Sequence, residues 1–275
     1  MELLTAELLA KYPSVSQAEI LDSVELAVMR VIEHTHKRPV SVVISDNDIA
    51  TTILDDNGFI PLQLSGLKNR LKRRIINEIE LELMERQAIA DAHYYRTIRG
   101  SAITGVIEHI QHHTGNLVVR LEFNDVMQPI VIYGECPVSQ QPVHERGTYQ
   151  LGSAMYFMVA QILPVTNGKN ARARVLLSRS ARELPARILT EITKLPGIRC
   201  VKRELSNYRH SRIVSRFALP VSAIKSVGKE LKEHIDITVC PAGQFPVFKD
   251  KRIPKAKHRK KKTVGSMATR IGRSF

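Results

Sequence analysis

Apolar and polar residues recur along the chain with two distinct periods, and these periods predict its elements. Ser16 can cap a helix over residues 17–34, in which the apolar positions form a single stripe. Residues 67–94 repeat apolar positions at the same helical spacing and predict a longer helix. Short apolar runs between these two helices predict three strands, at 39–44, 51–54 and 59–64.

Residues 100–179 consist of short strand-like runs separated by turns. The expected strands are 101–110, 117–123, 127–133, 155–165 and 174–177. Five strands in a segment of this length are typical of an OB-type barrel. Such barrels bind single-stranded nucleic acid by stacking bases on aromatic side chains and by guiding phosphates with cations.

The last of these strands runs directly into a helix within residues 171–198. Ser180 stands where an N-cap would be, with Glu183 three residues later, which predicts a capping box. Pro185 falls in the first turns and Pro196-Gly197 ends the helix. We interpret this stretch as a rigid joint between a β-domain and an α/β-domain. An ordinary β–α connection inside one domain is the alternative, and composition alone favours it.

The segment after the joint predicts a small α/β unit. Strands at 199–205 and 211–219 are followed by a helix at 221–232 and a strand at 234–239. Together with the joint helix, this gives the order α-β-β-α-β.

Composition and charge indicate several small domains and a polyanionic partner. The chain has 275 residues, 43% of them hydrophobic and none of them Trp, which predicts two or three domains with aliphatic cores. The formal net charge is +14, distributed as −3 over 1–100, +1 over 101–180, +6 over 181–248 and +10 over 249–275. Positive charge that gathers toward one end is expected of a segment that binds a polyanion.

The C-terminal segment 243–275 has no apolar periodicity and is expected to be disordered alone. A solubilising tail is one interpretation, and an RNA-binding arm is the one we favour because the cations are so dense. The residues assigned to RNA in this arm are Lys251, Arg252, Lys255, Lys257, Arg259, Lys260, Lys261 and Lys262.

Other classes of protein find little support in the sequence. The start MELLTAELLA lacks the features of a signal peptide, and no apolar run approaches the ~18 residues that span a membrane, so we expect no membrane partner. Three widely spaced cysteines are typical of reduced thiols and of a cytoplasmic location. His109, His112 and His113 have no partner at zinc-site spacing and are expected to be turn residues. We therefore expect no metal, no cofactor and no enzymatic activity.

Several phrases of the sequence resemble the bacterial transcription factor family NusA. Leu177-Ser178-Arg179-Ser180, with the helix and Pro-containing stop that follow, resembles the link between the S1 domain and first KH domain of that family. The phrase ELMERQAIADAHYYRTIRG resembles the helix that leads into the S1 domain, and Thr104-Gly105-Val106-Ile107 and NLVVRL resemble the first S1 strands. Ser211-Arg212-Ile213 and AIKSVGKELKEHIDI resemble parts of the first KH domain. The resemblance covers residues 15–240.

The resemblance implies a multidomain α+β fold. Its expected parts are a polymerase-binding N-terminal domain with a long connecting helix (1–98), an S1 barrel of the OB type (99–179), a KH-like module (180–242) and the basic tail (243–275). One departure matters: only Pro220-Val221-Ser222 separates strand from helix, where a KH fold needs a helix, a Gly-x-x-Gly loop and another helix. We therefore expect a KH-like scaffold without its backbone clamp, and the second KH domain of the family is missing.

The resemblance and the barrel pattern together suggest candidate RNA-binding residues. On the barrel these are Phe123, Tyr133, His109, Arg120 and Arg179. Core packing is an equally expected role for each aromatic residue. Arg70, Arg73 and Arg74 crowd a helix start, where the helix dipole disfavours cations, so we expect them to contact an anion. A solvated charged helix without a partner is the alternative.

The function implied is that of a NusA-like factor that binds RNA polymerase through residues 1–98 and single-stranded nascent RNA through its C-terminal half. It would modulate pausing, termination or antitermination, and other transcription factors or ribosomal proteins are further partners that this interpretation allows. The first alternative is an S1-type RNA-binding protein that acts on mRNA or ribosomes without polymerase. The second is an RNA-processing enzyme, for which no stretch remains to form a catalytic core.

Overall fold

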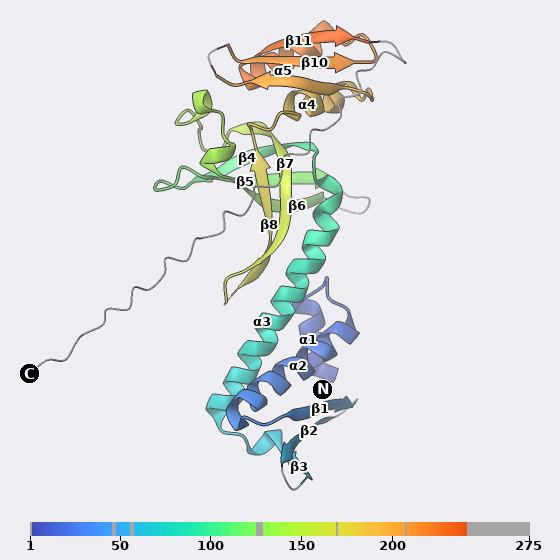
Figure 1. The fold of residues 1–275 in the computed structure, drawn as a ribbon, viewed down its shortest axis with the longest axis vertical. Coiled ribbons are helices and arrows are strands. Elements are labelled where there is room, and N and C mark those ends of the chain that lie inside the picture. The colour runs from blue at the N-terminus through green and yellow to red at the C-terminus, as the bar shows by residue number, and fades with distance from the viewer. Residues whose placement is uncertain are drawn as a thin grey trace, which may run out of the picture.

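The computed structural model describes residues 2–45, 48–55, 58–124, 129–168, 170–206 and 208–240, and it describes side chains throughout these ranges except at 2–6, 45, 48, 123–124 and 129–130. In this part of the chain the strands form three separate sheets, arranged one after another along an elongated molecule (Figure 1). The chain is therefore a mixed α and β protein with several sheets, which is compatible with the multidomain α+β class.

The N-terminal unit is a three-stranded sheet covered by helices. Its elements are α1 (Glu2–Lys11), α2 (Gln17–His36), β1 (Val40–Ser45), β2 (Asp48–Asp55), β3 (Gly58–Leu62), the 3₁₀ turn η1 (Leu64–Gly66) and α3 (Asn69–Tyr94). The two helices and three strands predicted here are confirmed. Ser16 caps α2: its hydroxyl accepts a hydrogen bond from the Glu19 main chain (3.3 Å), and the Glu19 carboxylate accepts one from the Ser16 main chain (2.9 Å).

Helix α3 belongs to two cores. Its residue Leu83 is fully buried against Tyr12, Val15 and Ile20 of the N-terminal unit. Its residue Ala92, near the other end, is buried in the core of the next unit. Figure 1 shows α3 as the long helix that joins the two.

The middle unit is a closed barrel with strand order β4-β5-β6-β8-β7. Its elements are η2 (Tyr95–Ile98), β4 (Ala102–Ile110), β5 (Leu117–Asn124), β6 (Pro129–Cys136), η3 (Val138–Gln140), η4 (Val143–Glu145), β7 (Ala154–Thr166) and β8 (Ala171–Ser178). The five predicted strands are confirmed, and the parallel pairing of β6 with β8 closes the barrel. The core of the barrel includes Ile107, Val119, Leu121, Phe157 and Leu177.

Gly105 permits close packing at the barrel wall. A Cβ atom at this position would lie 2.4 Å from Val119 Cγ1 and 2.6 Å from Leu121 Cδ2. Since real Cβ contacts are not this short, a larger residue would have to displace the side chains of Val119 and Leu121.

The C-terminal unit has the order α-β-β-α-β, as predicted. Its elements are α4 (Leu184–Thr193), β9 (Arg199–Glu204), β10 (His210–Ser215), α5 (Val221–Leu231) and β11 (His234–Val239). The sheet order is β11-β10-β9, with β10 and β11 parallel and joined through α5. Apolar residues of α4 and α5 cover one face of the sheet, and Ala102 of the barrel belongs to the same core.

The capping box predicted at the joint helix is wrong. Helix α4 begins only at Leu184, with Glu183 at the N-cap position and no side-chain cap. The main-chain N–H groups of Arg179 and Ser180 both donate to the Gln140 main-chain oxygen, at 2.9 and 3.0 Å, and hold this segment against the barrel before the helix begins. Pro185 does lie in the first turn of α4, as predicted.

None of the described helices is long and apolar enough to cross a lipid bilayer.

Candidate nucleic-acid interface

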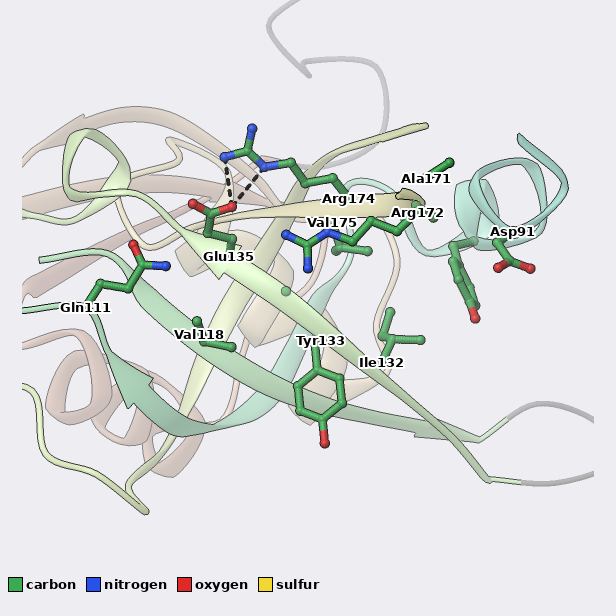
Figure 2. Close-up of a pocket in the computed structure, with 13 residues that line it drawn as sticks. Asp91, Gln111, Val118, Ile132, Tyr133, Glu135, Ala171, Arg172, Arg174 and Val175 are labelled. Carbon is green, nitrogen blue, oxygen red and sulfur yellow. Dashed lines mark hydrogen bonds and ion pairs between the residues drawn. The ribbon is translucent and has the colours of Figure 1, made fainter. Parts of the chain in front are cut away.

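A groove of about 440 Å³ runs over the outer face of the barrel, across strands β6 and β8 and beside the end of α3. Figure 2 shows Tyr133, Arg172 and Arg174 on this face, with Gln111 at one end of the groove and Asp91 of α3 at the other. An aromatic side chain beside two cations is the combination that single-stranded nucleic acid requires.

Strand periodicity places these side chains on one face. Gly134 of β6 pairs with Val175 of β8. The residue before each of them, Tyr133 on β6 and Arg174 on β8, therefore points outward. The neighbours that point inward, such as Ile132 and Val175, are buried in the barrel core. The outer face is therefore polar because the strands alternate, and the groove follows the line along which β6 and β8 pair.

The two arginines of the groove differ in their freedom. Arg174 donates from Nε and Nη2 to Oε2 of Glu135, at 2.9 and 2.8 Å, which fixes its guanidinium. Arg172 is exposed, and within the described part of the chain its side chain makes no hydrogen bond or ion pair. Arg172 therefore offers its full charge and donors to a phosphate, whereas Arg174 shares its charge with Glu135.

Tyr133 is the exposed aromatic residue of this groove. Its side chain is 57% exposed, although it stands in the middle of a strand. The exposed ring is therefore available as a stacking surface.

Arg120 and Phe123 lie on strand β5. Arg120 pairs in register with Tyr133, but its guanidinium is ion-paired with Glu108 at 2.7 Å and also with Glu122. The positive charge of Arg120 is therefore compensated by these two carboxylates. Phe123 pairs in register with Ile130, and its side chain lies outside the described residues.

His109 is exposed and lies apart from Tyr133. It lines a separate hollow at the β4–β5 loop, together with His112 and His113. Among the described residues, no group of three or more His, Cys, Asp or Glu side chains is placed to hold a metal ion.

Arg179 requires a correction. It was predicted to contact RNA, but its side chain is 0% exposed. Its Nε and Nη2 atoms bind the Glu145 carboxylate at 3.0 and 2.6 Å, and Nη1 binds Glu230 of α5 at 2.9 Å and the Tyr156 main-chain oxygen at 2.8 Å. Its donors are used within the protein, so Arg179 is a structural residue that joins the barrel to the C-terminal unit.

The cations at the start of α3 form no part of the groove. Arg70, Arg73 and Arg74 are exposed, and Nη1 of Arg74 lies 3.5 Å from His34 Nδ1 of α2. They lie beside the N-terminal sheet, at the end of α3 farther from the barrel (Figure 1). Their contact with an anion remains a prediction.

The predicted RNA-binding residues of the tail, from Lys251 to Lys262, lie outside the described residues. Their role also remains a prediction.

Arg172 and Arg174 were not predicted as site residues. The run Ala171-Arg172-Ala173-Arg174, which leads into the expected strand 174–177, is the signal that could have identified them, since period-two cations in a strand share one face.

Comparison with known proteins adds no relative: no protein-family model matches the chain, and no curated protein matches it.

Proposed function

We propose that this chain is a NusA-like transcription factor that binds single-stranded RNA on the outer face of its barrel and RNA polymerase through its N-terminal unit. The observation that carries the proposal is Tyr133, exposed on a closed five-stranded barrel with Arg172 and Arg174 beside it. The ring can stack on a base while the guanidinium groups bind neighbouring phosphates. In this proposal the chain acts in the cytoplasm by binding and catalyses no reaction.

The order of the units supports this proposal. A helix-covered sheet, a long helix, a closed five-stranded barrel and an α-β-β-α-β unit follow one another. This order is compatible with the succession of domains that the NusA resemblance implies. The KH-like unit would lack its backbone clamp, because β10 ends at Ser215 and α5 begins at Val221. Base selectivity should therefore be weak, since phosphate contacts position RNA without reading its sequence.

The outer face of the N-terminal sheet supports a protein partner. Val43, Leu54 and Phe59 are 60%, 43% and 71% exposed, and Leu54 pairs in register with Phe59. Exposed apolar patches of this kind mark protein-binding surfaces. In the proposal this face contacts RNA polymerase.

The RNA arm is tested by fluorescence anisotropy with the full chain and a short unstructured RNA. Arg172→Gln and Tyr133→Ala should each weaken binding by about tenfold. Arg187→Gln is the matched control, because Arg187 is an exposed arginine of α4 outside the groove. Equal losses of RNA affinity in Arg172→Gln and Arg187→Gln would contradict the proposal that RNA binds in the groove.

The polymerase arm is tested by capture of core RNA polymerase on the immobilised full chain, with and without ribonuclease. Capture should survive ribonuclease and should fall with Phe59→Ser. It should not fall with Ile76→Ser, which alters an exposed apolar residue of α3. Capture that disappears with ribonuclease would favour the alternative, an S1-type RNA-binding protein that acts on mRNA or ribosomes.

A further inference from the structure

The C-terminal sheet has one face that no described helix covers. Helices α4 and α5 pack on the side of Cys200 and Ile213, whereas the opposite face points away from the barrel (Figure 1). His210 and Arg212 of β10 lie on this open face, because the residues that alternate with them, Ser211 and Ile213, are buried.

A carboxylate joins two imidazoles on the open face. His210 and His234 are register partners on the parallel strands β10 and β11, and their rings are stacked with centroids 5.7 Å apart. Nε2 of His210 lies 2.7 Å from Oδ2 of Asp236, and Nε2 of His234 lies 3.1 Å from Oδ1. The hydrogen bond from His210 lowers the pKa of Asp236, and the charges of the two histidines lower it further.

This arrangement determines where a further proton binds. An ionised carboxylate only accepts hydrogen bonds, so each Nε2 carries the proton that it donates to Asp236. Nδ1 of each ring is then the atom that takes up the second proton. Each ring that takes up this proton adds one positive charge to the open face.

The other charges near the histidines favour an anionic ligand. Glu204 of β9 pairs in register with His210 and is itself ion-paired with Lys202. Arg212 lies on the same face as His210, and within the described part of the chain its side chain makes no hydrogen bond or ion pair. On the covered face, Glu233 is paired with Arg203. Acidification therefore adds charge to a surface on which Arg212 is already an available cation.

An aromatic residue stands at the same end of the sheet. Tyr208, in the turn between β9 and β10, is 85% exposed, and the next residue, Arg209, has a left-handed φ of 38° and an exposed side chain. An exposed ring beside cations is suited to base stacking and phosphate contact. The exposed side chains of this end are charged, polar or aromatic, which favours RNA over an apolar protein partner.

We propose that the open face of the β9–β10–β11 sheet is a second site for single-stranded RNA, in which protonated His210 and His234 bind phosphates and Tyr208 stacks on a base. The inference rests on the proposed RNA-binding function and adds a surface separate from the barrel groove. Affinity at this site rises as the pH falls.

The test measures RNA affinity of the full chain by anisotropy at about pH 7.5 and about pH 5.5, over a range of salt. Acidification should raise affinity about tenfold at fixed salt and steepen the slope of log affinity against log salt by about 1.4, which is about 0.7 for each of two phosphates. The double variant His210→Gln/His234→Gln should lose most of both effects. The matched control is His112→Gln/His113→Gln, which removes two exposed histidines of the β4–β5 loop and should retain them.

Two further variants separate a ligand site from a folding effect. Asp236→Asn removes an anion from the face and should strengthen RNA binding several-fold at about pH 7.5, a gain that a damaged fold cannot produce. Tyr208→Ala should weaken binding about tenfold at both pH values. Circular dichroism at both pH values controls for folding.

The outcomes distinguish the inference from the function on which it rests. A wild-type chain that binds no RNA at low salt at either pH would overturn both. A chain that binds RNA, with the same pH response in His210→Gln/His234→Gln as in the wild type, would overturn only the second site.

Discussion

Nη1 of Arg203 donates a hydrogen bond to the main-chain oxygen of Arg179 at 2.8 Å, which brings two arginines with buried side chains together at the turn between β8 and α4. Arg203 also binds the Ala181 oxygen at 2.6 Å and the Glu233 carboxylate. Arg179 binds Glu145 of the barrel and Glu230 of α5. The turn is thus held by charges whose partners come from both units, which gives the joint a fixed geometry.

Replacing Arg179 by methionine should destabilise the chain by about 3–5 kcal/mol, because the buried Glu145 carboxylate loses its partner. Urea unfolding followed by circular dichroism measures the change. Arg182→Met is the control: Arg182 pairs with Glu183 at the surface, where an ion pair contributes about 1 kcal/mol or less. Equal effects of the two substitutions would contradict the structural role of Arg179.

Removing the charge of Glu145 should have an effect that depends on pH. Burial raises the pKa of Glu145, but the hydrogen bond and charge of Arg179 outweigh burial and lower it overall. A lowered folded-state pKa stabilises the fold above the unfolded-state pKa, at about pH 5 and higher, and this contribution is lost as the pH falls through the folded-state value. Glu145→Gln should therefore melt below the wild type at neutral pH, and the difference should shrink toward about pH 3. A difference in Tm that stays constant across this range would contradict the lowered pKa.

The three cysteines should differ in reactivity. Burial raises the pKa of the Cys136 and Cys200 thiols to about 12, so neither forms the reactive thiolate at about pH 8. Cys240 is partly exposed. Iodoacetamide should label one thiol in the native chain and three in denaturant, counted by intact mass. Native labelling at Cys136 would show that the barrel opens readily.

Exposed and buried aromatic residues of the barrel should separate binding from stability. Tyr133→Ala should weaken RNA binding by about 1–3 kcal/mol and leave the Tm almost unchanged, and Phe123→Ala is predicted to weaken RNA binding by a similar amount. Phe157→Ala, in the fully buried core, should instead cost about 3–5 kcal/mol of folding stability. Anisotropy and thermal melting of the same samples measure both quantities. A large fall in the Tm of Tyr133→Ala would mean that its ring supports the barrel.

Deleting residues 249–275 should flatten the salt dependence of RNA binding. The segment carries a net charge of +10, and each phosphate neutralised on a single strand contributes about −0.7 to the slope. The slope should change by several units, while capture of polymerase through the N-terminal unit should persist. An unchanged slope would identify the segment as a solubilising tail.

Local pattern was sufficient to predict the strands and the helices other than α1, because each of these elements buries one face and its period appears in the sequence. It failed where distant residues decide the outcome. Arg179 is buried because Glu145 and Glu230 neutralise it, and these lie 34 and 51 residues away. Ser180 does not cap α4, because its main chain is held by Gln140 of the barrel and the helix begins only at Leu184.

The candidate sites were predictable to different degrees. Tyr133 could be placed on the barrel from strand alternation, and Arg172 and Arg174 carry the same signal. The cluster of His210, His234 and Asp236 depends on the register between two parallel strands, which is set by the packing of the intervening α5 and cannot be obtained from local sequence.

Helix α3 also fixes the rotation of the N-terminal unit relative to the barrel. Leu83, buried in the N-terminal core, and Ala92, buried in the barrel core, are nine residues apart, which at about 100° per residue is about two and a half turns. The N-terminal unit and the barrel therefore pack against opposite sides of α3. Deleting a residue between them would shorten the molecule by only about 1.5 Å but would turn the apolar sheet face by about 100° relative to the barrel groove. The number of residues in α3 thus sets the angle between RNA bound in the barrel groove and a protein bound on the N-terminal sheet.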